Sequence, residues 1–355
     1  MDCDLTEAAK GSSAGVVLAI GAALLAAMAP AMAQTPAVED FYQTHPITML
    51  VASGVGGGYD VYARAFARFW TNHIPGRPAI IPKNMQAAAG LAEANTLYSS
   101  SERDGSVIGA FTNGAAMDPL FGNPSARFDA QKFNWLGSIG KLENVCDTWH
   151  TSPVKTIADA RAREVVVSAA GATSNSNIVP RMLNALMGTR FKIVAGYDTN
   201  ALTLAVERGE VEGNCGLSWS TLKASRPYWI RDHLLNVIVQ LGLTKLRDLP
   251  DVPSALDLVE GAENRQVMEL ILMRQEAGRP FAAPPDTPTD RVAALRRSFE
   301  ETLKDPDFVA EAENSQLEIE PLTGEEIERL LAKAYAAPKA VVQRAAELVY
   351  PMGVK

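Results

Sequence analysis

Short apolar runs alternate with amphipathic segments along most of the chain. The runs that we expect to form buried strands lie at positions 46–51, 79–81, 106–111, 164–169 and 191–194. Segments with apolar residues at helical spacing follow them, near positions 60–70, 91–99, 180–187 and up to about 207. Strands that alternate with helices predict an α/β fold with parallel sheets.

The last part of the chain has a different pattern. Amphipathic helices are expected near positions 289–304, 307–315, 324–336 and 338–349. Apolar residues recur there at a spacing typical of helices that cover a core on one side. We therefore expect a group of C-terminal helices after the alternating part of the fold.

The N-terminus looks like an export signal. Residues 14–29 form an apolar run that ends in Pro30-Ala31-Met32-Ala33, and this run is shorter than the roughly 18 residues that a membrane helix needs. Alanines at both small-residue positions fit a signal-peptidase site. We predict that residues 1–33 are a signal peptide, cleaved after Ala33, and that the protein is periplasmic. The acidic residues before the run are unusual in a signal, and a buried N-terminal helix is the alternative.

The composition is that of a globular protein with a net negative charge. The chain has 355 residues, enough for two domains, and a formal charge of −8 with 47% hydrophobic and 21% charged residues. No run of Lys or Arg occurs, so we expect no nucleic-acid partner, because phosphate binding requires a basic patch. The four His and three Cys are scattered, so we expect no metal site and no cofactor.

Two cysteines, Cys146 and Cys215, remain after the predicted signal peptide is removed. In an oxidising compartment such a pair is more often bridged than free, so we expect a disulfide between them. Two separate buried thiols are the alternative.

Three loops share one design, in which an expected strand is followed by small or polar residues and then by a helix. They lie at positions 54–60, 171–177 and 196–200. In parallel α/β sheets such loops meet at the carboxyl edge of the strands, where ligands bind. A helix N-terminus offers unpaired N–H groups and a partial positive charge, so it can bind an anion. The alternative is that they are ordinary turns in which Asp60 and Ser174 cap helices.

The sequence lacks the common catalytic and nucleotide-binding motifs. Tyr59 stands where a dinucleotide-binding fingerprint needs its third glycine, and no GxxxxGK[ST] motif occurs. Neither HExxH nor GxSxG is present. We therefore expect no enzymatic activity.

Several short motifs follow one another in a familiar order. They are Pro46-Ile47-Thr48, Gly56-Gly57-Gly58-Tyr59-Asp60, Asn84 with Gly90, Asp104-Gly105, Gly209-Glu210-Val211-Glu212, Leu249-Pro250-Asp251-Val252-Pro253-Ser254 and Pro284-Pro285-Asp286-Thr287-Pro288. In this order and spacing the mature chain resembles, nearly end to end, the periplasmic receptors of tripartite tricarboxylate transporters, the Bug family.

The resemblance implies a two-domain periplasmic-binding-protein (Venus flytrap) fold with parallel-rich sheets and C-terminal helices. Residues 34–139 and 271–355 would form the first domain, and residues 140–270 the second. It further implies a solute receptor that holds a small organic acid between the domains and delivers it to two integral-membrane transporter subunits. We expect a monomer.

The resemblance also implies which residues bind the ligand, largely through backbone N–H groups and waters. In the first domain they are Gly56, Gly57, Gly58, Tyr59, Asp60, Asn113, Gly114, Ala115 and Ala116. In the second domain they are Thr173, Ser174, Asn175, Ser176, Asn177, Tyr197, Asp198, Thr199 and Asn200.

Two departures from the family pattern put the usual dicarboxylate specificity in doubt. Met85 and Gln86 replace the family's Arg-Pro, and Gly216 stands where its aspartate is expected. A secreted α/β enzyme and a flytrap-like sensory receptor remain alternatives, because a fold alone does not determine function.

Overall fold

The computed structural model describes residues 30–197 and 199–350. The predicted signal peptide therefore lies almost entirely outside the described residues, as does Asp198. Within the described ranges, no helix has both the length and the apolar character that a membrane span requires.

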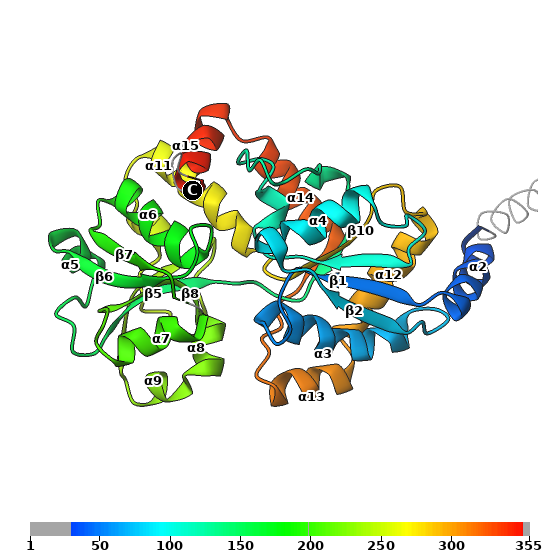
Figure 1. The fold of residues 1–355 in the computed structure, drawn as a ribbon, viewed down its shortest axis with the longest axis horizontal. Coiled ribbons are helices and arrows are strands. Elements are labelled where there is room, and N and C mark those ends of the chain that lie inside the picture. The colour runs from blue at the N-terminus through cyan, green and yellow to red at the C-terminus, as the bar shows by residue number, and fades with distance from the viewer. Residues whose placement is uncertain (1–29, 198, 351–355) are drawn as a thin grey trace, which may run out of the picture.

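The chain forms two α/β domains, each built on its own sheet (Figure 1). The first sheet has the strand order β11-β4-β10-β3-β1-β2. Its strands are β1 (Ile47–Val51), β2 (Ile80–Asn84), β3 (Val107–Ala110), β4 (Asn134–Ser138), β10 (Pro280–Ala283) and β11 (Leu322–Thr323). Strand β1 is parallel to β2 and β3, whereas β10 is antiparallel to β3 and β4, and β11 is antiparallel to β4.

The second sheet has the order β7-β6-β8-β5-β9. Its strands are β5 (Asn144–Trp149), β6 (Val165–Ala169), β7 (Phe191–Ala195), β8 (Gly213–Ser218) and β9 (Leu235–Leu241). Strand β6 is parallel to β7 and β8, and β5 is antiparallel to β8 and β9.

The predicted α/β class with two domains is confirmed, and each sheet combines parallel neighbours with antiparallel ones. The parallel strands are those joined by helical crossovers, as the alternating pattern indicated. The antiparallel strands β5 and β10 enter their sheets directly from the other domain. The hydrophobic pattern of a single strand does not predict whether that strand will be parallel or antiparallel to its neighbours.

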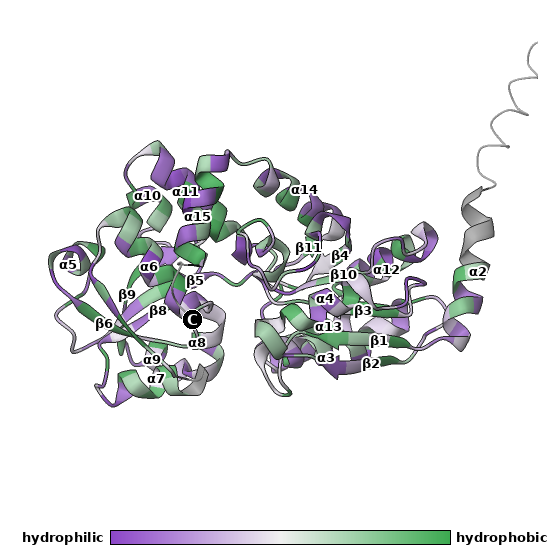
Figure 2. Cartoon of the chain, turned by 45° about the horizontal axis from the view of Figure 1, so that its top comes forward, coloured by the Kyte–Doolittle hydropathy of each residue, from purple (hydrophilic) through white to green (hydrophobic). Residues whose placement is uncertain are grey.

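Helices cover both faces of each sheet, and the strands between them are mostly hydrophobic (Figure 2). Helices α3, α12 and α13 cover one face of the first sheet, and α4 and α14 cover the other. Helices α7, α8 and α9 cover one face of the second sheet, and α6, α11 and α15 cover the other. The helices are α2 (Pro30–Thr44), α3 (Gly58–His73), α4 (Leu91–Ser99), α5 (Ile157–Ala162), α6 (Asn175–Met187), α7 (Thr199–Glu207), α8 (Trp219–Ser225), α9 (Pro227–Arg231), α10 (Ala255–Leu258), α11 (Ala262–Leu272), α12 (Thr289–Thr302), α13 (Pro306–Asn314), α14 (Gly324–Tyr335) and α15 (Lys339–Val349), with 3₁₀ turns η1 (Ala87–Gly90), η2 (Ala115–Met117), η3 (Ala130–Lys132) and η4 (Met273–Gln275).

The helices that were predicted lie close to the positions expected from the sequence, with one informative exception, whereas α2, α5 and α8 to α11 were not predicted. Helix α4 and the four C-terminal helices lie where the periodicity places them. Helix α6, however, begins at Asn175 rather than near Pro180, so residues expected in a loop form its first turn. Pro180 lies inside the helix, where its missing N–H removes one backbone hydrogen bond.

Two of the segments that pass between the domains are hydrogen-bonded to each other. One leads from β4 to β5, and the other leads from η4 to β10. Gln275 joins them, because its carbonyl accepts from Leu142 N–H and its side-chain oxygen accepts from Asn144 N–H, both at 3.0 Å. A third segment leads from α14, which packs on β4, to α15, which packs on α6 and α11.

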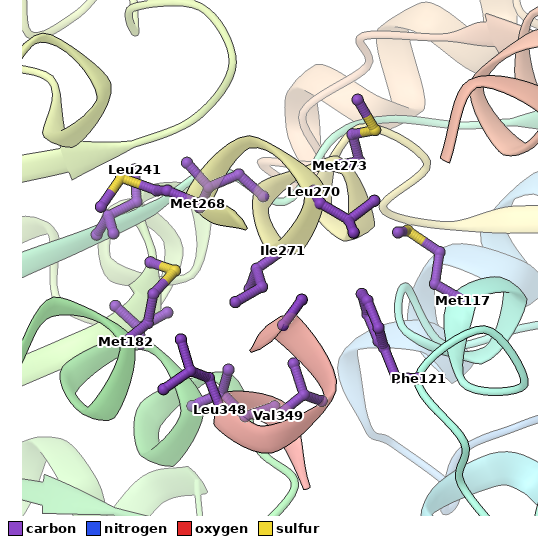
Figure 3. Close-up of a cluster of buried hydrophobic side chains, with 14 of the residues drawn as sticks. Met117, Phe121, Met182, Leu241, Met268, Leu270, Ile271, Met273, Leu348 and Val349 are labelled. Atoms are coloured by element: carbon purple, nitrogen blue, oxygen red, sulfur yellow. The ribbon is translucent and has the colours of Figure 1, made fainter. Parts of the chain in front are cut away.

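A continuous group of buried apolar side chains connects the two domains, and we call it the bridging core. Helices α11 and α15 supply its centre, α6 and β9 supply the second-domain side, and the η2 region supplies the first-domain side (Figure 3). Its labelled members are Met117, Phe121, Met182, Leu241, Met268, Leu270, Ile271, Met273, Leu348 and Val349.

The domain boundaries given above remain a proposal. The strands of the first sheet fall within the two ranges assigned to the first domain, and those of the second sheet fall within 140–270. Helix α15 packs on α6 and α11, although its residues lie in the range assigned to the first domain.

The expected disulfide between Cys146 and Cys215 is present. The two residues are register partners on the neighbouring antiparallel strands β5 and β8, beside a bulge after Val145. Both cysteines are fully buried, so the bridge fastens two central strands of the second sheet inside the core.

Thiol labelling of the unfolded, unreduced mature protein tests the bridge, and we expect no reactive thiol. Replacing both cysteines with alanine should lower the free energy of unfolding by up to about 4 kcal/mol, because the bridge closes a loop of 69 positions. Two labelled thiols per chain in the wild type would contradict the assignment.

Candidate functional site

The loop after β1 is organised by the carboxylate of Asp60, which is 2% exposed. Asp60 is the third residue of α3, not its cap, and its Oδ2 accepts a hydrogen bond from Gly56 N–H at 2.9 Å. Its Oδ1 accepts from Asn84 Nδ2 and Arg64 Nε, both at 2.7 Å. The glycine loop is therefore held by a side chain that turns back toward it from the helix.

The Asp60 network holds this carboxyl in its charged form. Burial raises the pKa of Asp60, but the hydrogen bonds from Gly56, Asn84 and Arg64 outweigh burial and bring the pKa below its ordinary value. Asp60 therefore positions the loop, and its oxygens are already occupied by protein donors.

Tyr59 links this loop to the loop after β3. Its hydroxyl donates to Asn113 Oδ1 and accepts from Asn113 N–H, both at 3.1 Å. The two ligand-binding segments predicted in the first domain are thereby held together, and Tyr59 and Asn113 line the same cavity.

In the second domain the corresponding element is the first turn of α6. Ser176 Oγ accepts from Ala170 N–H at 3.0 Å, which fixes the start of the helix on the preceding loop. The backbone N–H groups of Asn175 and Ser176, like those of any first helical turn, have no acceptor within the helix. They are available to an anion.

Gly216 brings β8 against this turn. A Cβ at Gly216 would lie 2.3 Å from the carbonyl oxygen of Asn175, and the residue has a φ of +95°. Both facts require glycine. The departure from the family pattern at this position thus allows close packing of β8 under the α6 N-terminus.

A cavity of about 610 Å³ lies between the domains. Its first-domain wall includes Tyr59, Asn113 and Gly114, and its second-domain wall includes Gly171, Thr173, Ser174 and Asn175. The remaining lining residues are Ala88, Leu91, Thr112, Asp118, Asn123, Ser125, Arg274 and Tyr350.

Six predicted ligand-binding residues therefore meet at one cavity, whereas the others lie around it. Ala115 and Ala116 are core residues of η2, and Ser176 and Asn177 are buried in α6. Gly56, Gly57, Gly58 and Asp60 form the loop and helix start behind Tyr59. Tyr197 instead contacts Glu210 and does not line the cavity, and Thr199 and Asn200 begin α7.

The sequence did not single out three functional groups of the cavity, namely Arg274, Asp118 and Tyr350. Arg274 lies in η4 and Tyr350 follows α15, so both come from the connections between the domains. Burial raises the pKa of Asp118, although Arg274 and the hydroxyl of Tyr350, which donates to its Oδ1, act in the opposite direction. No loop motif surrounds these residues, and only the fold brings them together.

A larger interdomain cavity, about 730 Å³, contains none of the predicted ligand-binding residues. Some of its charged lining residues are paired, namely Lys223 with Asp248 and Glu318, and Lys141 with Glu320 at 3.0 Å and with Glu276 at 3.4 Å. Among the residues that the structure describes, no group of three His, Cys, Asp or Glu side chains could hold a metal ion.

Comparisons with known proteins identify the class of this fold. No family model matches the sequence. A UPF0065 protein of Agrobacterium vitis is 24% identical over 294 residues, which cover 81% of this chain and 79% of the relative. A solved TctC solute-binding protein from Polaromonas has a TM-score of 0.66 at 17% identity, covering 85% of this chain and 99% of that one. MatC from Rhodopseudomonas palustris, solved with bound malate, has a TM-score of 0.61 at 18% identity, covering 86% and 99%.

The fold is thus that of the two-domain periplasmic solute-binding proteins. More particularly, its solved neighbours are receptors of the TctC type, so the resemblance to the tripartite tricarboxylate receptors is confirmed at the level of the fold.

Replacing Asp60 with alanine should lower the free energy of unfolding by about 2 kcal/mol at pH 7, because it removes the charge-assisted hydrogen bonds from Gly56, Asn84 and Arg64. The lowered pKa of Asp60 means that its stabilisation is present above about pH 4 and is lost as the pH falls through the folded-state pKa. Denaturant unfolding from pH 7 to pH 3 should therefore show a shrinking difference between wild type and variant. A difference that stays constant over this range would contradict the assigned charge state.

Proposed function

We propose that the protein is an exported periplasmic receptor that binds a small carboxylate-bearing compound in the 610 Å³ interdomain cavity. The observation that carries this proposal is the meeting of the α3 and α6 N-terminal regions at one cavity, with Tyr59 on one wall and Asn175 on the other. Each helix N-terminus offers N–H donors and a partial positive charge to an anion.

A receptor fits the cavity better than an enzyme does. The described lining residues include no histidine, cysteine or lysine, and the carboxylate of Asp118 is paired with Arg274 and Tyr350 rather than with a serine or threonine nucleophile. The malate bound to MatC, a protein of the same fold, supports a carboxylate as the ligand.

Delivery to two integral-membrane subunits follows from the resemblance to the tripartite receptors. In this proposal the mature protein is a periplasmic monomer released by cleavage after Ala33. Measuring uptake of the identified acid in cells that lack this protein separates transport from sensing. Uptake is lost if the protein serves transport, whereas it is unchanged if the protein is a sensory receptor.

A thermal-unfolding screen of the mature protein against organic acids tests the binding function. An acid present at 100 times its dissociation constant should add about 2.7 kcal/mol to the free energy of unfolding. Two variants at one position then test the mode of binding. Asn175→Pro removes the first N–H of α6 at a position where proline suits a helix, whereas Asn175→Ala removes only the side chain.

We expect the proline variant to bind the acid at least about tenfold more weakly than the alanine variant, because a charge-assisted hydrogen bond is lost. Equal affinities, with both variants folded, would contradict binding at the α6 N-terminus. If no organic acid stabilises the wild type, the receptor function itself is wrong.

A further inference from the structure

Arg274 is a buried cation in the wall of the cavity. Its side chain is 6% exposed, and its Nη2 lies 3.5 Å from Asp118 Oδ1. Its Nε and Nη1 are buried and have no hydrogen-bond partner in the described part of the protein. Arg274 lines the cavity, so the wall of the cavity contains a cation of which two nitrogens have no partner.

Such an arrangement is costly unless a ligand completes it. A buried donor without a partner costs about 1–3 kcal/mol, and more when it is charged. Asp118 neutralises the charge of Arg274 only in part, because its Oδ1 also accepts a hydrogen bond from the hydroxyl of Tyr350. A guanidinium that is only partly paired attracts a carboxylate, and each of its free N–H groups can donate a hydrogen bond to a carboxylate oxygen.

The first-domain wall leaves room for this side chain. A Cβ at Gly114 would lie 2.0 Å from Arg274 Nη2, so the guanidinium rests directly on the backbone of this residue. Gly114 belongs to the loop after β3, and Arg274 comes from η4, far away in sequence. Glycine at position 114 and arginine at position 274 thus form one unit of the site.

We propose that Arg274 binds the carboxylate of the ligand and that the ligand carries a single carboxylate on an apolar body. This proposal rests on the receptor function proposed above and specifies its substrate class. Arg274 and the amides of the α6 N-terminus would hold the acid group, and Gly114 would fix the position of the arginine.

An adjoining apolar cavity has room for the body of the ligand. It measures about 570 Å³ and shares Thr173 and Tyr350 with the first cavity. Its other lining residues are mostly apolar or small, namely Phe121, Gly122, Pro124, Ala172, Gln343, Ala346, Glu347 and Val349. Several of them belong to the bridging core or lie beside it.

The distribution of charge favours one carboxylate over two. Among the described residues that line either of the two cavities, Arg274 is the only Lys or Arg, whereas Asp118 and Glu347 are acidic. A second carboxylate reaching the apolar cavity would find no cationic side chain among its described lining residues, because Arg344, which pairs with Glu347 at 3.1 Å, is not one of them. Burial of an unpaired charge is strongly unfavourable.

Two sets of matched probes test the proposal by calorimetry on the mature protein. One set is octanoate, octanamide and octanedioate, and the other is benzoate, benzamide and benzene-1,4-dicarboxylate. Within at least one set the monocarboxylate should bind at least about tenfold more tightly than its amide and its dicarboxylate. Tighter binding of the dicarboxylate in both sets would overturn the substrate class.

Variants test the role of Arg274 itself. Arg274→Gln should weaken binding of the tightest-binding acid of the panel by at least about tenfold, and should change binding of the matching amide by less than about twofold. Gly114→Ala, which displaces the guanidinium without removing it, should also weaken binding of the acid. Arg161→Gln is the matched control, because Arg161 also has an unpaired Nε but lies outside both cavities.

The outcomes separate this proposal from the receptor function. Undiminished acid binding by a folded Arg274→Gln variant would overturn the role of Arg274 and leave the receptor function standing. If neither probe set and no acid in the thermal screen binds the wild type, both proposals fall together.

Discussion

The bridging core determines how the two domains face each other, and the site depends on that relation. Met117 and Phe121 of the first domain belong to one buried apolar group with Ile271, Val349 and Met182. Because interiors are close-packed, these contacts resist separation of the domains on this side. The α3 and α6 N-terminal regions are thereby brought to one cavity, although they belong to different sheets.

The elements that make the bridging core also supply the chemistry of the cavity. Arg274 lies in η4, which directly follows α11, and Tyr350 directly follows α15, so the packing that joins the domains also places a cation and a hydroxyl beside Asp118. The strand–loop–helix units supply backbone donors, which suit many anions. The connecting elements supply the side chains that distinguish one anion from another.

The sequence predicted the regular part of this structure well, because hydrophobic spacing reports directly on buried faces. Helix α4 and the four C-terminal helices, the loop before Asp60 and the pairing of Cys146 with Cys215 all follow from local pattern or compartment. The antiparallel entry of β5 and β10 did not follow from local pattern, since the direction of a strand depends on the path of the chain between the domains.

Arg274 was missed because its role depends on tertiary packing. In the sequence, a single arginine near the end of an amphipathic helix resembles a solvent-facing residue, and only the tertiary fold buries it. Six predicted ligand-binding residues line the cavity, whereas Tyr197 bonds to Glu210 instead.

Residue-resolved hydrogen exchange, with and without a bound organic acid, tests most directly whether one ligand lies between the two helix N-terminal regions. The first-turn amides of α3, including Tyr59, and those of Asn175 and Ser176 in α6 exchange readily when they have no acceptor. We expect one acid to slow amide hydrogen exchange at both helix starts together, because the acid bridges the domains. Protection confined to one helix start, or absent from both, would contradict it.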